Sequence, residues 1–193
     1  MRIIAGRWRS RLLARPPGRT TRPMPDRVRE TVFSVLGAHY ECPGALPALH
    51  VADVFAGTGS IGLEALSRGA ASCCFFERDR QALAVLRQNL ASLGAGPEAT
   101  VVTRDAWHSA LVASSERPFD LVFLDPPYED TEDVSENGPL HRFLVDLFER
   151  GGTGPLAVLH HHAKVGLENT RHSAYRIVDQ RTMGTNGVTM FAR

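Results

Sequence analysis

Residues 51–62, with the sequence VADVFAGTGSIG, decide the fold of this 193-residue chain. An apolar run that ends in closely spaced glycines is typical of a buried strand, a tight turn and the start of a helix. Gly57 and Gly59 allow the backbone to turn sharply and to approach a ligand closely. Together with Gly62 they satisfy the G-x-G-x-x-G pattern of dinucleotide-binding loops, so one hypothesis is that the protein is an NAD-dependent enzyme. This order of elements predicts a doubly wound α/β domain with a mostly parallel sheet and a ligand at the carboxyl edge of its strands.

Four acidic residues stand at or just after the ends of predicted strands. They are Asp53, Glu77, Asp105 and Asp125. The runs that precede the last three are residues 73–76, 99–103 and 119–124. A single acid in such a place is commonly the N-cap of a helix. Four in succession favour a shared binding site, because ligands of open α/β sheets bind beyond the carboxyl ends of the strands.

The tetrapeptide Asp-Pro-Pro-Tyr at residues 125–128 follows the last of these strands directly. Its two prolines fix two φ angles and remove two backbone N–H donors, which makes the loop stiff. The Asp125 carboxylate and the Pro126 carbonyl can accept hydrogen bonds from an exocyclic amine, while the Tyr128 ring stacks on a flat ring. Asp-Pro-Pro also forms ordinary turns, so the motif gains its meaning from the glycine-rich loop upstream.

The two motifs together resemble the class I S-adenosylmethionine (SAM)-dependent methyltransferases. An acid just before the glycines would repel a diphosphate and suits a ligand that has an amino group and a sulfonium. The resemblance implies that Glu77 binds the ribose hydroxyls of SAM and that Asp105 and Ala106 contact its adenine. The residues that it assigns to the cofactor loop, at the amino-acid end of SAM, are Asp53, Ala56, Gly57 and Gly59.

Residues 125–128 also match the [DNS]PP[YFW] signature of methyltransferases that act on amino groups. By this resemblance the catalytic residues are Asp125, Pro126 and Tyr128. Asp125 and the Pro126 carbonyl would orient the target amine, and Tyr128 would stack on a base turned out of its helix. Because an aromatic amine is a weak nucleophile, positioning and electrostatics would provide most of the rate enhancement.

The C-terminal part of the chain predicts a strand and a hairpin, and no metal site. The apolar run 155–159 is followed by three histidines, residues 160–162. Adjacent strand residues point to opposite faces, and no cluster of cysteine or aspartate completes a ligand set, so we expect no metal. Residues 175–183 and 188–192 predict an antiparallel hairpin, with the turn signal Asn-Gly at residues 186–187.

The N-terminal segment is strongly basic. Residues 1–29 hold nine arginines and one acid, although the formal net charge of the whole chain is only +1. We interpret residues 1–22 as a small β-hairpin arm and residues 23–193 as the methyltransferase domain. Such a charge block is typical of a segment that binds a phosphate backbone, and the alternative is a solvated tail. The residues expected to bind RNA are Arg7, Trp8, Arg9, Arg11 and Arg22.

A finer resemblance covers nearly the whole chain. The sequence RIIAG at residues 2–6 and DRVRE at residues 26–30 precede the glycine-rich loop and the Asp-Pro-Pro-Tyr motif in the order found in the bacterial 16S rRNA (guanine-N2)-methyltransferase D family. Met24 departs from that family, which commonly has threonine after Arg-Pro. The resemblance implies transfer of a methyl group from SAM to the N2 amine of guanine 966 in 16S rRNA, with the small ribosomal subunit as the expected partner.

Two other classes of function remain open. A DNA adenine-N6 methyltransferase uses a similar tetrapeptide and cofactor fold, and a non-catalytic nucleotide-binding protein would explain the glycine-rich loop alone.

No apolar run approaches the roughly 20 residues that cross a bilayer, and the arginines near the start do not suit a signal peptide. Three cysteines do not indicate a disulfide framework. We therefore expect a cytoplasmic, monomeric protein that does not associate with membranes.

Overall fold

The computed structural model describes residues 1–16, 24–107, 117–150, 154–167 and 172–193. The helices are α1 (Asp26–His39), α2 (Ser60–Arg68), α3 (Arg80–Leu93) and α4 (Pro139–Arg150), with a 3-10 helix η2 (Tyr128–Thr131). The strands are β1 (His50–Val54), β2 (Ser72–Phe76), β3 (Ala99–Val102), β4 (Leu121–Leu124), β5 (Leu156–His162), β6 (Arg176–Met183) and β7 (Asn186–Ala192). Within these ranges, no helix has the length and apolar character needed to cross a membrane.

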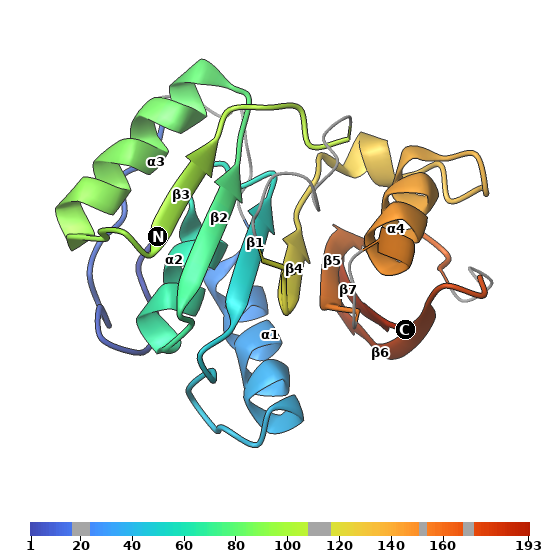
Figure 1. Ribbon diagram of the computed structural model, residues 1–193, viewed down its shortest axis with the longest axis horizontal. Helices are drawn as coiled ribbons and strands as arrows, with labels where there is room; N and C mark the ends of the chain where they lie inside the picture. The colour runs from blue at the N-terminus through green and yellow to red at the C-terminus, as the bar shows by residue number, and fades with distance from the viewer. Residues whose placement is uncertain (17–23, 108–116, 151–153, 168–171) are drawn as a thin grey trace.

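The described strands form one sheet in the order β3-β2-β1-β4-β5-β7-β6. Strands β1 to β5 pair in parallel, whereas β7 is antiparallel to both of its neighbours. Strands β2 and β3 extend the sheet on one side of β1, and β4 to β7 extend it on the other side (Figure 1). The predicted doubly wound, mostly parallel sheet with an antiparallel C-terminal hairpin is confirmed.

The turn of the C-terminal hairpin differs from the prediction. Met183 pairs with Asn186, so the turn is formed by Gly184 and Thr185 and not by Asn186 and Gly187. Gly184 has a φ of 63°, in the left-handed region that a two-residue hairpin turn requires. Asn186 therefore becomes a strand residue, and its side chain is available to the site described below.

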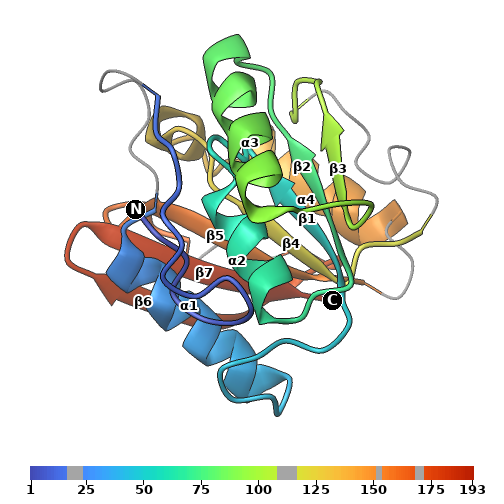
Figure 2. The same cartoon turned by 90° about the vertical axis from the view of Figure 1, so that its left-hand side faces the viewer.

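Helices cover both faces of the sheet. The helices α1, α2 and α3 pack on one face through residues such as Phe33, Leu63 and Leu86, and α4 packs on the other face through Leu144 and Phe148. Figure 2 shows the first three helices in front of the sheet and α4 behind it. Successive strand residues alternate between the two cores, which explains why the strands that the helices cover are apolar along their whole length.

The described part of the N-terminal segment lies against the body of the protein. The N–H of Ile3 donates to the Arg11 carbonyl, and an antiparallel bridge joins Arg2 to Leu12, so the segment folds back on itself. Ile3 and Leu13 are buried in the same core as the helices on that face. The proposed boundary at residue 22 lies outside the described residues, but residues 1–16 share the core of the body and do not stand apart from it.

A buried carboxylate on α2 attaches this segment to the body. Glu64 is fully buried and accepts hydrogen bonds from the N–H groups of Ile4 (2.7 Å) and Ala5 (3.0 Å). It also accepts from Arg68 Nε at 2.7 Å and lies 3.7 Å from Arg29 Nε. One carboxylate therefore satisfies two backbone donors and stands next to two guanidinium groups that have little or no contact with water.

Replacing Glu64 with alanine should destabilise the protein strongly. The change removes the carboxylate partner of the buried Arg68 and leaves the buried Arg29 with Asp26 alone. We therefore expect the free energy of unfolding to fall by about 3–5 kcal/mol. The matched control is Glu98→Ala, which removes the partner of the half-exposed Arg7 and should cost less than about 1 kcal/mol. Denaturant unfolding of the three proteins provides the comparison. Equal small losses in both variants would show that Glu64 does not attach the segment.

Candidate functional site

A cavity of about 340 Å³ opens at the carboxyl ends of the parallel strands. This volume lies at the lower end of the range for small-molecule sites. The cavity is next to the point where the sheet changes its direction of growth, between β1 and β4, which is where ligands of open α/β sheets bind. Eight of the residues predicted for the site line it. They are Ala56, Gly57, Glu77, Asp105, Ala106, Asp125, Pro126 and Tyr128.

The β1–α2 loop forms one wall of the cavity with an unusual backbone. Phe55, Gly57 and Gly59 all have positive φ angles, of 65°, 55° and 79°. Such a conformation is common for glycine but unusual for phenylalanine, and Phe55 is a lining residue that the sequence reasoning missed. Gly59 faces away from the cavity, because a Cβ built there would lie 2.4 Å from a methyl carbon of Leu86.

Asp53 lies beneath the loop and, like Gly59, is not among the residues that line the cavity. Their assignment to the amino-acid end of SAM stays a prediction. The Asp53 side chain is fully buried, and its Oδ2 accepts a hydrogen bond from the Gly62 N–H at 2.8 Å. Its other oxygen has no hydrogen-bond partner among the described residues. Burial raises the pKa of Asp53 well above its ordinary value, and Asp125 and Glu77 add to this effect, while the Gly62 N–H opposes it.

Glu77 connects the end of β2 to the glycine-rich loop. Its Oε2 accepts a hydrogen bond from the Gly57 N–H at 2.8 Å, and its Oε1 accepts from the N–H groups of Arg78 and Asp79. These three backbone donors fix the orientation of the carboxylate at the cavity wall. A carboxylate in a fixed position can accept further hydrogen bonds from a pair of ligand hydroxyl groups, because each oxygen has two acceptor sites.

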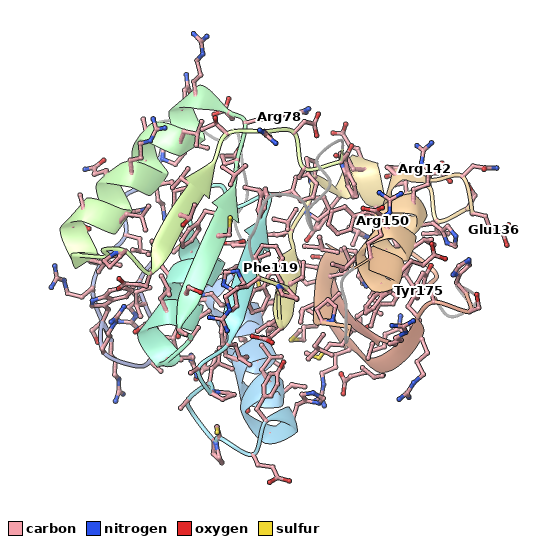
Figure 3. All side chains as sticks on the ribbon, viewed as in Figure 1. Arg78, Phe119, Glu136, Arg142, Arg150 and Tyr175 are labelled. Carbon is pink, nitrogen blue, oxygen red and sulfur yellow. The ribbon has the colours of Figure 1, made fainter. Side chains whose placement is uncertain are left out.

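Asp105 forms the next part of the wall. Its Oδ2 pairs with Arg78, which Figure 3 shows above the carboxyl ends of β2 and β3, and its Oδ1 accepts from the Trp107 N–H. The Trp107 ring lies 4.8 Å from that of Phe55, and its Nε1 donates to Asp130 at 3.0 Å. Trp107 thus joins the loop after β3 to η2. No motif or spacing in the sequence indicates this contact.

Asp125 and Tyr128 face His160, a histidine to which the sequence analysis assigned no role in the site. His160 Nδ1 lies 2.7 Å from Asp125 Oδ1, and its Nε2 lies 3.3 Å from the Tyr128 hydroxyl. The three histidines of β5 alternate in direction, since the His161 ring bonds to Thr189. No group of three metal-ligand side chains is found in the described part of the chain.

The arginines of the N-terminal segment lie on its outer surface. Arg7 pairs with Glu98 at 2.6 Å, and Arg11 donates to the Ser92 carbonyl at 2.8 Å, so both also attach the segment to the body. Arg9 is exposed. Trp8 packs against the core beneath, with the Arg7 guanidinium 4.1 Å from its ring centroid. Arg22 lies outside the described residues.

The geometry of the cavity is compatible with a nucleoside that bears a cationic group. Two carboxylates, Glu77 and Asp105, stand where hydroxyl and amino donors of a nucleoside can reach them. The backbone at Gly57 approaches the cavity without a side chain, so a ligand can contact the loop directly. At the other end, Asp125 and Tyr128 provide an acceptor and an aromatic ring for a second, flat molecule.

The sheet order, the glycine-rich loop and the acidic carboxyl edge define a Rossmann-like methyltransferase fold. A solved structure from Escherichia coli described as "Putative methyltransferase yhhF" superimposes with a TM-score of 0.78 and 33% sequence identity, covering 100% of this chain and 97% of that one. The sequence profile of the family described as "Conserved hypothetical protein 95" matches residues 1–192. The chain belongs to this family.

Curated relatives agree with this assignment. "Putative rRNA methyltransferase YlbH" of Bacillus subtilis is 32% identical over 195 residues, which cover 100% of this chain and 99% of that protein. "Ribosomal RNA small subunit methyltransferase D" of Escherichia coli is 44% identical over 128 residues, which cover 66% of this chain and 60% of that protein. The resemblance to the methyltransferase D family is thereby confirmed.

Asp53→Asn should change how stability depends on pH. A carboxyl group whose pKa is higher in the folded protein than in the unfolded chain binds more protons when folded. The wild type should therefore lose stability as pH rises from about 4, the ordinary value for aspartate, towards the raised pKa. The asparagine variant lacks this loss and still offers an acceptor to Gly62. In thermal unfolding from pH 4 to 8, the stability of the variant relative to the wild type should increase as pH rises. A stability difference that does not change with pH would contradict the raised pKa of Asp53.

Proposed function

We propose that the protein transfers the methyl group of SAM to the N2 amine of a guanine in 16S rRNA, guanine 966 by the family resemblance. The observation that carries this proposal is that Glu77 and the loop of residues 125–128 line one cavity. A nucleoside cofactor and an amine-bearing base would therefore meet in the same space. The relatives named as ribosomal RNA methyltransferases support the choice of rRNA.

SAM would occupy the part of the cavity next to β1, β2 and β3. Glu77 would accept from the ribose hydroxyls, and Asp105 and Ala106 would contact the adenine. Ala56 and Gly57 would lie along the amino-acid end, while Asp53 and Gly59 would act from beneath by shaping the loop. When bound, SAM supplies a methyl group activated by a sulfonium.

The base would enter beside residues 125–128 after leaving its helical stack. Asp125 and the Pro126 carbonyl would accept hydrogen bonds from the two protons of the amine, which would orient the nitrogen lone pair. The Asp125 carboxylate would also stabilise the positive charge that develops on the nitrogen. Tyr128 would provide the stacking surface. The methylated amine is acidic enough to lose its proton to water, so Asp125 need not act as a base.

The arginine-rich segment would bind the RNA backbone outside the cavity. Arg7, Arg9 and Arg11 bring positive charge to the face of α2 and α3. Arg7 also has a second role at Glu98, and Trp8 packs on the core, so Arg9 is the residue of this group best placed to contact phosphate alone. The protein would act as a cytoplasmic monomer on rRNA within a small-subunit particle.

Asp125→Ala should abolish methyl transfer while SAM still binds. The matched variant Glu77→Ala should show the opposite pattern, with SAM affinity weakened by about 1.5–3 kcal/mol, the range for a hydrogen bond to a charged group. Calorimetry with SAM and transfer of labelled methyl to 16S rRNA or small-subunit particles separate the two effects. Mass analysis of the product nucleoside identifies the modified amine. An N6-methyladenine product in DNA, or unaltered activity of Asp125→Ala, would contradict the proposal.

Arg9→Ala should weaken RNA binding at low salt and reduce its salt dependence. If Arg9 contacts one phosphate, the slope of log affinity against log salt should fall by about 0.7–0.9, because one fewer counterion is released. The matched control is Arg150→Ala, at the end of α4 on the other face of the sheet (Figure 3). RNA affinity at several salt concentrations provides the test. Identical slopes for the wild type and Arg9→Ala would remove Arg9 from the interface.

A further inference from the structure

His160 stands directly behind the carboxylate that is proposed to orient the target amine. It lies on β5, and its side chain is only 2% exposed, whereas that of Asp125 is 16% exposed. The Nδ1 to Oδ1 distance of 2.7 Å is that of a short, charge-assisted hydrogen bond. Because His160 occupies Oδ1, the oxygen left to accept from an amine in the cavity is Oδ2.

The other side of the His160 ring also faces an acceptor. Nε2 lies 3.0 Å from Asn186 Oδ1 on β7. The amide of Asn186 cannot simply be turned round, because its Nδ2 donates to the Met183 carbonyl at 3.2 Å. The Tyr128 hydroxyl donates to the same Asn186 oxygen at 3.2 Å. Two ring nitrogens that both face oxygen acceptors are satisfied only when both carry a proton.

The electrostatic surroundings agree with a charged ring. Burial lowers the pKa of His160, but the hydrogen bond and the negative charge of Asp125, together with Asn186, outweigh it, so the pKa is raised above its ordinary value. Among the residues that the structure describes, the titratable groups that face the ring are Asp125 on the loop after β4 and Tyr128 on η2. His162 lies on the far side of Tyr128, with 5.5 Å between the ring centroids.

We propose that His160 is a positioning residue of this site: as an imidazolium bonded to Asn186 and Asp125, it fixes the Asp125 carboxylate with one oxygen directed to the target amine. The same network holds the Tyr128 hydroxyl, so strands β5 and β7 align both ends of the Asp-Pro-Pro-Tyr loop. This inference rests on the proposed function, because it assumes that Asp125 receives an amine.

Protonation of the His160 ring makes this arrangement sensitive to pH. The doubly protonated ring is present below the raised pKa of His160 and is lost as pH rises through it. Once Nε2 loses its proton, its lone pair faces the Asn186 oxygen, and that hydrogen bond is replaced by repulsion. Methyl transfer should therefore fall on the alkaline side as the ring deprotonates, although Asp125 itself remains ionised.

The first measurement is independent of activity. Long-range ¹H–¹⁵N spectra of the histidine rings distinguish a doubly protonated ring from either neutral form, and His160→Asn identifies the His160 signals. In the wild type both ring nitrogens should be protonated at pH 7, with a titration midpoint above that of an exposed histidine. In Asp125→Asn the midpoint should move to lower pH. A neutral His160 ring at pH 7 in the wild type would overturn the proposal.

The second measurement is the single-turnover rate of methyl transfer to 16S rRNA between pH 6 and 9. His160→Ala should lower the rate on the order of a hundredfold, the scale for a misplacement of about 1 Å, with SAM affinity unchanged. His160→Asn keeps an N–H where Nδ1 was and cannot titrate, so it should retain most of the rate and lose the alkaline fall. His162→Asn removes the other ring beside Tyr128 and should keep that fall.

An alkaline fall that persists in His160→Asn, or a His160→Ala variant with the wild-type rate, would overturn the positioning role. A wild-type protein that methylates no RNA, with the ring titration as expected, would overturn the proposed function and the positioning role with it. An active wild type with a neutral His160 would overturn the positioning role alone. The two failures are therefore distinguishable.

Discussion

The hydrogen bond from the Gly62 N–H to the buried carboxylate of Asp53 is the interaction on which the site depends. Asp53 lies near the end of β1, and Gly62 lies in the first turn of α2, so this bond sets how the chain leaves the sheet. Position 62 must be glycine, because a Cβ would lie 2.4 Å from the ring of Phe75 on the neighbouring strand. Burying a carboxylate is costly, and the Gly62 N–H offsets part of that cost.

The cavity follows from this turn and from a second carboxylate. Glu77, at the end of β2, accepts from the Gly57 N–H and thereby joins the glycine-rich loop to the next strand. Because parallel strands end at the same edge, the loops after β3 and β4 complete the walls with Asp105 and Asp125. Backbone N–H groups thus orient Glu77 and one oxygen of Asp105. The Asp125 carboxylate is instead oriented by a side chain, that of His160.

The antiparallel hairpin at the C-terminus contributes to the site as well as to the core. Residues of β5 and β7 pair as neighbours, which brings Asn186 next to His160 and places both behind the Asp-Pro-Pro-Tyr loop. The prolines make that loop stiff, but they cannot hold the Asp125 side chain in one orientation. The hydrogen bonds of His160 with Asp125 and with Asn186 can hold that side chain. The pairing of β7 with β5 brings these two residues together.

The sequence by itself determined the doubly wound sheet, the glycine-rich loop, the acidic carboxyl edge and the residue 125–128 motif. These features depend on local preferences: apolar periodicity, the conformational freedom of glycine and the rigidity of proline. Only the tertiary structure decided that Asp53 lies beneath the loop, that Glu64 binds the backbone of Ile4, and that His160 supports Asp125 from 35 residues away. These contacts depend on how segments that are distant in the chain pack together. The type of a residue and its neighbours in the sequence therefore do not predict which partner a buried polar group finds.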